Sequence, residues 1–173
     1  MISLYDISVA TYLQTLAGLS TVLDKGLAFC KENKIDPDTL VGMRLYDDMH
    51  PFRFQVHQSV RHSQGALEAI KSGQFSPGPQ GAENDNYAAL QALVAGAQTA
   101  LQNLKPEAIN ARAGGDVLFS AGKFELPFTA ENFILSFSLP NFYFHVTTAY
   151  DILRLKGVPL GKRDYLGPMK LKQ

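Results

Sequence analysis

Apolar side chains recur at helical spacing in four long segments of the chain. In the first, steps of three and four residues place apolar side chains on one face from Val9 to Leu27. This pattern predicts an amphipathic helix of roughly 25 residues. A second stripe runs from Phe52 to Ile70 and should end near Gly73, because "SGQFSPGPQG" stacks residues that break helices. We expect the core to form where these apolar faces meet.

Two further helices are predicted in the second half of the chain. The run "ENDNYAALQALVAGAQTALQNL" keeps its apolar residues in helical register. The run "AENFILSFSLPNFYFHVTTAYDILRLKG" follows Thr129, a good N-cap residue, and ends at Gly157. Pro140 lies inside this last helix, so it should kink the helix and free one backbone carbonyl.

Shorter elements are predicted between and after the long helices. Asp36 and Pro37 open a short helix through Met43, and Pro51 in the first turn starts the second long helix with Asp47, Asp48 or His50 as its cap. The run "DVLFSAGKFELPF" predicts a hairpin around its Ala-Gly pair. The run "KPEAINARAGG" is predicted to terminate the third helix, and the basic tail "LGKRDYLGPMKLKQ" is predicted to be extended. The pattern therefore predicts one all-α domain over residues 1–173: a four-helix bundle with a short helix after helix 1 and a small β-hairpin before helix 4.

Composition and charge narrow the class of protein. The chain has 173 residues, which suits one domain, and it carries 16 Lys plus Arg against 16 Asp plus Glu. This balance argues against nucleic acid as a partner. The chain has no run of 18 apolar residues, so no membrane span is expected, and the N-terminus lacks a basic leader and places Asp6 early, so it fails as a secretory signal. Because Cys30 has no partner for a disulfide, we expect a reduced, cytoplasmic protein.

The stretch "LPNFYFHVTTAY" carries the first candidate chemistry. It places Asn141 and His145 one helical turn apart on a mostly apolar and aromatic helix. A buried imidazole needs a partner for each ring nitrogen. Two interpretations stay open: the pair is one turn of a metal site, or both side chains make structural hydrogen bonds to each other, to the carbonyl freed by Pro140 or to water.

The remaining histidines differ in their surroundings. His50 precedes a proline and is expected at a helix start, as a cap or in solvent. His57 shares a face with charged and amide side chains, which indicates a solvated face. His62 instead stands in a row with Gln55, Ser59 and small residues, a row that could line a shallow cavity beside the apolar stripe. His62 is therefore the second candidate site residue.

Three motifs resemble a known family. They are the start "ISLYDISV", the second-helix start "DMHPFRFQV" and the end "LPNFYFHVTTAYDILRLKGVPLGKRDYLG". The chain is identified by them as similar, over its full length, to a bacterial domain-of-unknown-function family within the DinB/YfiT-like metalloenzyme superfamily. The resemblance implies a DinB/YfiT-like four-helix bundle.

The resemblance also implies a set of metal ligands. In that superfamily an HxxxH pair on the last helix is followed about twelve residues later by a "GVP" exit, and a third histidine comes from the second helix. His145 matches the second histidine of the pair and His62 matches the third. Asn141 replaces the first histidine, and "HVTT" replaces the HRGQ-like run of the superfamily. Neutral imidazole is a strong ligand for zinc, nickel or iron, whereas an amide oxygen is weak, so the implied divalent-metal site is degenerate.

Two functions from different classes follow. The resemblance implies metal-assisted transfer of a small thiol, with His62, His145 and Asn141 around the metal. The rival is a non-catalytic module that binds a small-molecule ligand or forms a homodimer without metal, since aromatic residues spread around the last helix. In this second case the same groups form a polar pocket, with Gln55, Ser59, Tyr143 and Tyr150 as its expected neighbours.

Overall fold

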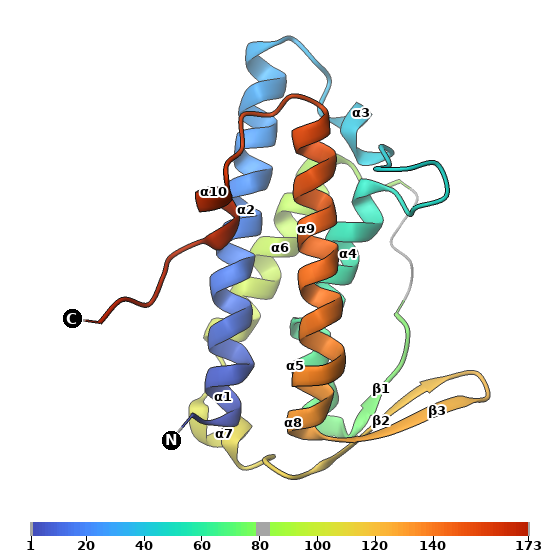
Figure 1. The fold of residues 1–173 in the computed structure, drawn as a ribbon, viewed down its shortest axis with the longest axis vertical. Coiled ribbons are helices and arrows are strands. Elements are labelled where there is room, and N and C mark those ends of the chain that lie inside the picture. Colours follow the sequence, from blue (N-terminus) through green and yellow to red (C-terminus); the bar gives the residue numbers. More distant parts are fainter. Residues whose placement is uncertain (1, 79–83, 173) are drawn as a thin grey trace.

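Helices dominate the structure. The computed structural model describes residues 2–78 and 84–172, and Figure 1 shows its long helices running side by side. The first half contains α1 (Leu4–Ile7), α2 (Val9–Glu32), α3 (Asp38–Val41), α4 (Phe52–Arg61), α5 (Gln64–Ser72) and the strand β1 (Gln74–Phe75). The second half contains α6 (Tyr87–Gln102), α7 (Pro106–Asn110), β2 (Asp116–Ala121), β3 (Phe124–Thr129), α8 (Ala130–Asn132), the π-helix η1 (Phe133–Ser138), α9 (Leu139–Leu155) and α10 (Lys162–Leu166).

The core lies between four helical segments. Helix α2 packs along α6 and α9, and α4 packs along both α6 and α9. The largest fully buried side chains come from these segments and include Tyr12, Phe52, Tyr87, Phe133 and Phe142. Burial of such aromatic rings contributes much of the hydrophobic stabilisation of a chain of this size. The predicted stripes on these segments thus form the core, as expected from their spacing.

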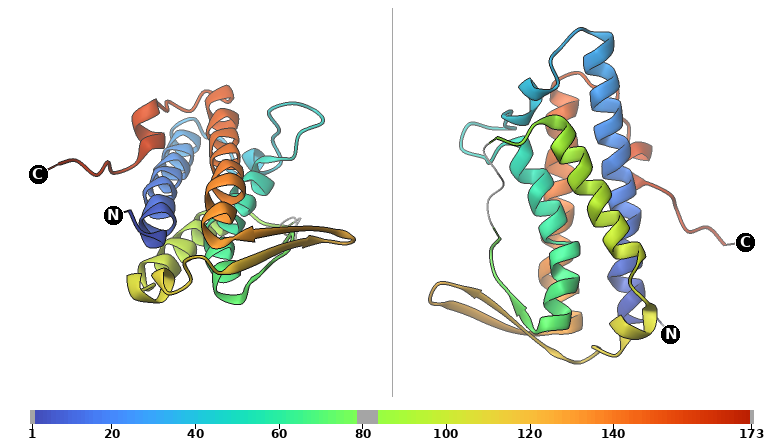
Figure 2. Two further views of the ribbon diagram at one scale, coloured as in Figure 1. Left: turned by 60° about the horizontal axis from the view of Figure 1, so that its bottom comes forward. Right: turned by 180° about the vertical axis from the view of Figure 1, so that it is seen from behind.

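A small three-stranded sheet lies at one end of the helices. Strands β2 and β3 pair antiparallel, and Gly122 in their turn has a φ of +64°, a conformation that glycine adopts without strain. Strand β1 adds a parallel edge to β2, which the sequence did not predict. Figure 2 shows the hairpin extending sideways from the lower ends of the helices.

The second long helix is broken where the sequence predicted continuity. Helix α4 ends at Arg61, with His62 as its C-cap, and α5 begins at Gln64 after Ser63. At the break Ser63 N–H bonds the carbonyl of Val60, a tighter turn than the α-helix makes. Serine hydroxyls that bond carbonyls four residues earlier, as Ser63 does to Ser59, often bend helices. None of the proposed caps is used, because Pro51 occupies the N-cap position without a side-chain bond.

The last helix absorbs Pro140 by a change of helix type. Thr129 caps its start as predicted, through a bond from the Asn132 N–H. Residues Phe133–Ser138 then adopt a π-helix before α9 begins at Leu139. A π-helical turn bonds residues five apart, so the proline that follows needs no partner in the usual α-helical ladder.

Two short helices replace segments that were predicted to be irregular. The terminator sequence contains α7, and the basic tail, expected to be extended, contains α10 docked on α2. The contact with α10 requires Gly18, because a Cβ there would lie 2.2 Å from the carbonyl oxygen of Tyr165. Lys25 and Asp164 add an ion pair of 2.7 Å across it. In the part of the chain that the structure describes, no helix has both the length and the apolar character for crossing a membrane.

Candidate functional site

His62 and His145 come together although they are 83 positions apart in the sequence. His62 caps the C-terminus of α4 and His145 lies in the middle of α9. Their ring centroids are 5.9 Å apart and the planes differ by 17°. The two imidazoles that the sequence predicted to share one site therefore lie next to each other.

Gln55 fixes the protonation of His145. The side-chain Nε2 of Gln55 donates to the carbonyl of His50 over 2.9 Å, which leaves its Oε1 as the acceptor. Oε1 lies 2.8 Å from Nδ1 of His145, so Nδ1 carries the proton and donates it. A neutral His145 then has its lone pair on Nε2. This is the arrangement by which a second side chain orients a histidine as a ligand or base.

The sheet and the π-helix enclose His62. Its ring lies 5.5 Å from that of Phe75 on β1 and 5.6 Å from that of Phe137 on η1. His62 is only 7% exposed, and its Nδ1 is buried without a hydrogen-bond partner among the described residues. A buried polar atom of this kind costs about 1–3 kcal/mol unless a ligand or water satisfies it. The site therefore has an unmet hydrogen-bonding or coordinating group.

Both imidazoles are held in the neutral form. Burial lowers the pKa of His62 to about 3, helped by the nearby His145 and Arg61. Burial also lowers the pKa of His145 to about 4, with a smaller effect of His50. Neutral imidazoles at pH 7 are able to coordinate a metal or accept a proton.

Asn141 has a structural bond. Its Nδ2 donates to the carbonyl of Phe137, one turn earlier, over 2.7 Å. This agrees with the interpretation in which the asparagine satisfies a backbone carbonyl near Pro140. Its Oδ1 is left as an oxygen that could contribute to the site. Ser59 is buried and its hydroxyl donates to the carbonyl of Gln55, within the same helix.

A buried hydrogen-bond chain holds the helix break in place. The hydroxyl of Tyr12 on α2 donates to Oγ of Ser138 over 2.8 Å. Ser138 in turn donates to the backbone carbonyl of His62 over 2.6 Å. Three helical segments are thereby joined at the residue that carries one of the two site imidazoles.

Tyr143 and Tyr150 lie away from this pocket, contrary to the expectation. Tyr143 faces Thr15 on α2, and Tyr150 stacks edge-on against Tyr165 of α10. The physical reason is helical geometry: steps of two and five residues from His145 turn a side chain by roughly 200° and 140°. Both tyrosines therefore belong to another face of α9.

The prediction of a solvated His57 is also wrong in part. His57 is half-buried and its Nε2 contacts the carboxylate of Asp85. Asp85 lies in the segment before α6, so no local sequence pattern predicts its contact with His57. His50 stacks on Phe54 with 4.0 Å between ring centroids, and Phe54 meets His145 edge-on at 5.9 Å. These rings form the wall of the site on the α4 side.

The donor set for a metal is small. Across residues 2–78 and 84–172, no three His, Cys, Asp or Glu side chains gather closely enough to hold a metal ion. The structure brings together the imidazoles of His62 and His145, and Asn141 lies one turn before His145 on the same helix. Two imidazoles fit a divalent transition metal in part, since catalytic zinc sites have three protein ligands.

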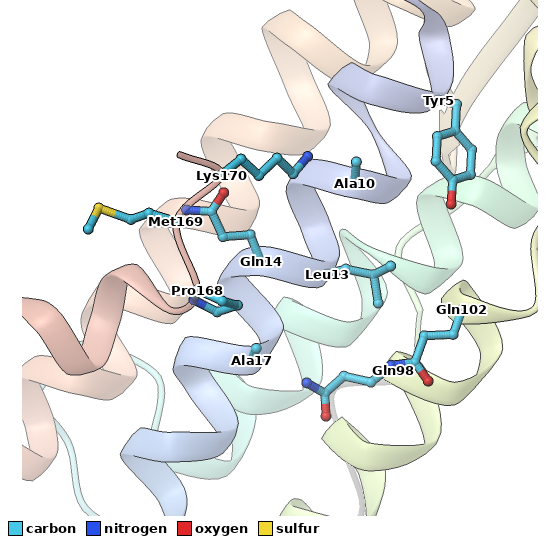
Figure 3. Close-up of a pocket in the computed structure, with 10 residues that line it drawn as sticks. All are labelled: Tyr5, Ala10, Leu13, Gln14, Ala17, Gln98, Gln102, Pro168, Met169 and Lys170. Carbon is cyan, nitrogen blue, oxygen red and sulfur yellow. The ribbon is translucent and has the colours of Figure 1, made fainter. Parts of the chain in front are cut away.

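A pocket lies away from the histidine pair. It has a volume of about 460 Å³ and is bounded by α1, α2, α6 and the C-terminal tail. Figure 3 shows Gln98 and Gln102 of α6 and Leu13 of α2 on its walls, with Lys170 of the tail close to α2. None of the site histidines lines this pocket, whereas neutral imidazoles and an unsatisfied buried nitrogen coincide at the histidine pair.

Comparisons with known proteins agree with this fold. The family described as a domain of unknown function, DUF1993, matches residues 4–166. The chain belongs to this family. A crystal structure of a DinB family member protein from Shewanella denitrificans is similar to this DUF1993 chain with a TM-score of 0.80 and 29% sequence identity. The match covers 98% of this chain and 95% of that chain, and no curated protein matches. The resemblance drawn from the three sequence motifs is confirmed.

Sequence reasoning missed the aromatic wall of the DUF1993 site. Phe75 arrives on the edge strand β1, which lies in a glycine- and proline-rich segment that gave no strand signal. Phe137 belongs to η1, where the π-helical turn shifts each side chain away from the face that α-helical spacing assigns. The aromatic run of the last helix was a signal for burial, but not for contact with His62.

Proposed function

We propose that the His62–His145 pair binds a divalent transition metal ion through its two imidazoles, as a site that keeps two of three histidine ligands. The observation that carries this proposal is the bond from His145 Nδ1 to Gln55, which leaves Nε2 as a lone-pair donor beside His62. The unpartnered Nδ1 of His62 supports it, because a bound ion would satisfy a nitrogen that the protein leaves alone. Zinc, nickel and iron are the ions that suit imidazole ligands.

Asn141 and solvent or substrate would complete the ligand shell. The amide oxygen of Asn141 is a weak ligand, and its nitrogen is already bonded to Phe137. A metal here would lower the pKa of a bound thiol or water and so supply a nucleophile. The family resemblance points to a small thiol, which makes metal-assisted thiol transfer the proposed reaction class.

Metal binding should depend on the two histidines and on Gln55. We expect chelator-treated protein to take up about one Zn²⁺ or Ni²⁺ per chain in isothermal titration, and His145→Ala to abolish this uptake. Gln55→Met removes the acceptor for Nδ1–H, together with the donor to the His50 carbonyl, but keeps both imidazoles, so affinity should fall about 10–100-fold. His57→Ala, a histidine paired with Asp85 outside the site, is the matched control and should bind as the parent does.

The outcomes separate coordination from structural roles. Equal uptake by the parent and His145→Ala, or no uptake by either, would contradict the metal proposal. Uptake that survives only in the parent and in His57→Ala would support it. A Co²⁺-loaded sample then tests the thiol step, because a thiol that coordinates the metal changes the visible spectrum, whereas one that stays in solution does not.

A second candidate is a metal-free module that forms a homodimer. The observation that favours it is Phe144, which is 58% exposed although its ring lies 5.4 Å from that of His145. A large exposed aromatic ring beside a pocket suits a contact between two copies, which are most often symmetric dimers. In that case the neutral imidazoles only complete a polar cavity.

Phe144 should then control the oligomeric state. We expect Phe144→Ser to convert a dimer into a monomer in sedimentation velocity, while Leu155→Ser, an equally exposed apolar residue near the end of α9, leaves the dimer intact. A parent protein that sediments as a monomer at high concentration would exclude the dimer and leave the metal proposal unaffected.

A further inference from the structure

A second pocket, separate from the histidine pair, lies between α9 and α10. It has a volume of about 230 Å³ and is lined by Thr147, Tyr150, Asp151, Lys162 and Tyr165. This volume is smaller than the range of about 300–1,000 Å³ that suits drug-sized ligands, so the pocket suits a molecule of few heavy atoms. Its lining contains two tyrosines and one threonine, with one carboxylate and one ammonium group.

Two tyrosines form adjacent walls of this pocket. The ring centroids of Tyr150 and Tyr165 are 6.1 Å apart and the planes meet at 80°. Rings at a right angle present two π surfaces to one volume, which is how aromatic cages hold methylated ammonium groups. The hydroxyl of Thr147 donates to the hydroxyl oxygen of Tyr165 over 3.1 Å and so helps to orient that ring.

The tyrosine on α10 is held firmly against the body of the protein. Its backbone carbonyl lies in the space left by the missing side chain of Gly18. The side chain of Gln14 donates to the Leu166 carbonyl over 3.1 Å, and Lys25 pairs with Asp164. The two walls are therefore arranged before any ligand arrives, which reduces the entropic cost of binding.

Asp151 supplies an unpaired negative charge. In the described residues it has no ion-pair or hydrogen-bond partner through its side chain, and partial burial raises the pKa of its carboxyl group. No described lysine or arginine lies over Tyr150 or Tyr165, since the cation–π contact of the structure joins Arg61 to Phe75. A carboxylate beside two tyrosine rings that carry no described cation favours a cationic ligand.

The positive charge of Lys162 restricts the kind of cation that this pocket can bind. Its ammonium group belongs to the lining and would repel a simple cation, but it would pair with an anionic group on the same ligand. We propose that this pocket binds a small zwitterion that carries a quaternary ammonium group and a carboxylate. The ammonium lies against Tyr150, Tyr165 and Asp151, and the carboxylate faces Lys162.

The test compares two probes of the same shape in two-dimensional NMR titrations. Glycine betaine and 3,3-dimethylbutanoate share the carboxylate and the three methyl groups, but only betaine carries the positive charge. The parent protein should bind betaine about tenfold more tightly than 3,3-dimethylbutanoate, which lacks the positive charge, with resonances of α9 and α10 shifting. Equal affinity for both probes, or no shifts with betaine, would overturn the proposal.

Variants assign the preference to the cage. Tyr165→Leu and Asp151→Asn should each remove most of the preference for betaine, whereas Tyr165→Phe keeps the π surface and should retain it. Tyr46→Leu, at a tyrosine that is 70% exposed in a loop, is the matched control. The spectrum of each variant reports whether α10 stays docked. A preference that survives both Asp151→Asn and a folded Tyr165→Leu would contradict the assigned residues.

Discussion

Lowering the pH from 7 to 5 should reduce the free energy of unfolding of the metal-free protein by about 4 kcal/mol. Burial lowers the pKa of His62 to about 3 and that of His145 to about 4. An unfolded histidine titrates near pH 6.5, so between pH 6.5 and 4 the unfolded chain binds more protons than the folded chain. The unfolding free energy therefore falls as the pH falls, by about 2 kcal/mol per histidine at pH 5.

The charged groups around His62 and His145 do not change the direction of this pH dependence. Arg61 faces His62, and His50 faces His145, and both oppose a proton on the neighbouring ring. The aspartates with lowered pKa values, Asp6 and Asp164, lose their contributions only as the pH approaches the acid range near 4. The window from pH 7 to 5 therefore reports mainly on the histidines.

Urea unfolding at pH 7 and pH 5, in the presence of a chelator, measures this loss. A His62→Gln/His145→Gln protein should show less than half of the parent's loss, and His57→Gln should show nearly all of it. A parent protein with the same free energy of unfolding at both pH values would mean that the pair takes up protons in the folded state, against the burial of both rings.

The histidine pair shows how far the sequence reaches. His145 and His62 were paired by resemblance to a motif, and their closeness follows from the packing of α4 on α9. Gln55 was expected nearby because it shares a helical row with His62. Its bond to His145 depends on the relative height of two helices, which no local spacing specifies.

Irregular backbone explains most of what the sequence could not predict. The break at His62 and the π-helix before Pro140 both change which face a side chain occupies, and spacing arguments assume a constant 3.6 residues per turn. The expectation that Tyr143 and Tyr150 lie beside the histidine pair was wrong for the opposite reason. Regular helical spacing from His145 already placed both tyrosines on another face of α9. Prolines and serines in the sequence indicate where a helix is expected to be irregular, but they do not predict whether a break or a π-helix forms there.

The two irregular segments meet at one buried contact. The break in the second helix makes the carbonyl of His62 available, and Ser138 is the last residue of η1, immediately before α9. The serine bonds that carbonyl and accepts from Tyr12, so it joins the two irregular segments to α2. The position of His62 relative to His145 thus depends on the Ser138 hydroxyl, which is outside the proposed set of metal ligands.

Ser138→Ala should destabilise the protein by about 2–5 kcal/mol. The change leaves two buried groups without partners, the hydroxyl of Tyr12 and the carbonyl of His62, and each such group costs about 1–3 kcal/mol. Urea unfolding at pH 7 measures the difference. Ser136→Ala is the matched control, since the Ser136 hydroxyl is exposed and bonds a carbonyl within its own helix, and it should change stability by less than about 0.5 kcal/mol.

A double-mutant cycle with Tyr12→Phe identifies the cause of the destabilisation by Ser138→Ala. Tyr12→Phe removes one of the two orphaned groups, so adding it to Ser138→Ala should recover about 1 kcal/mol, although Tyr12→Phe alone is destabilising. Additive losses would instead mean that the cost arises from the cavity left by the serine. The cycle therefore distinguishes a hydrogen-bond chain that fixes the helix break from ordinary packing at the same contact, because only the chain makes the second substitution favourable after the first.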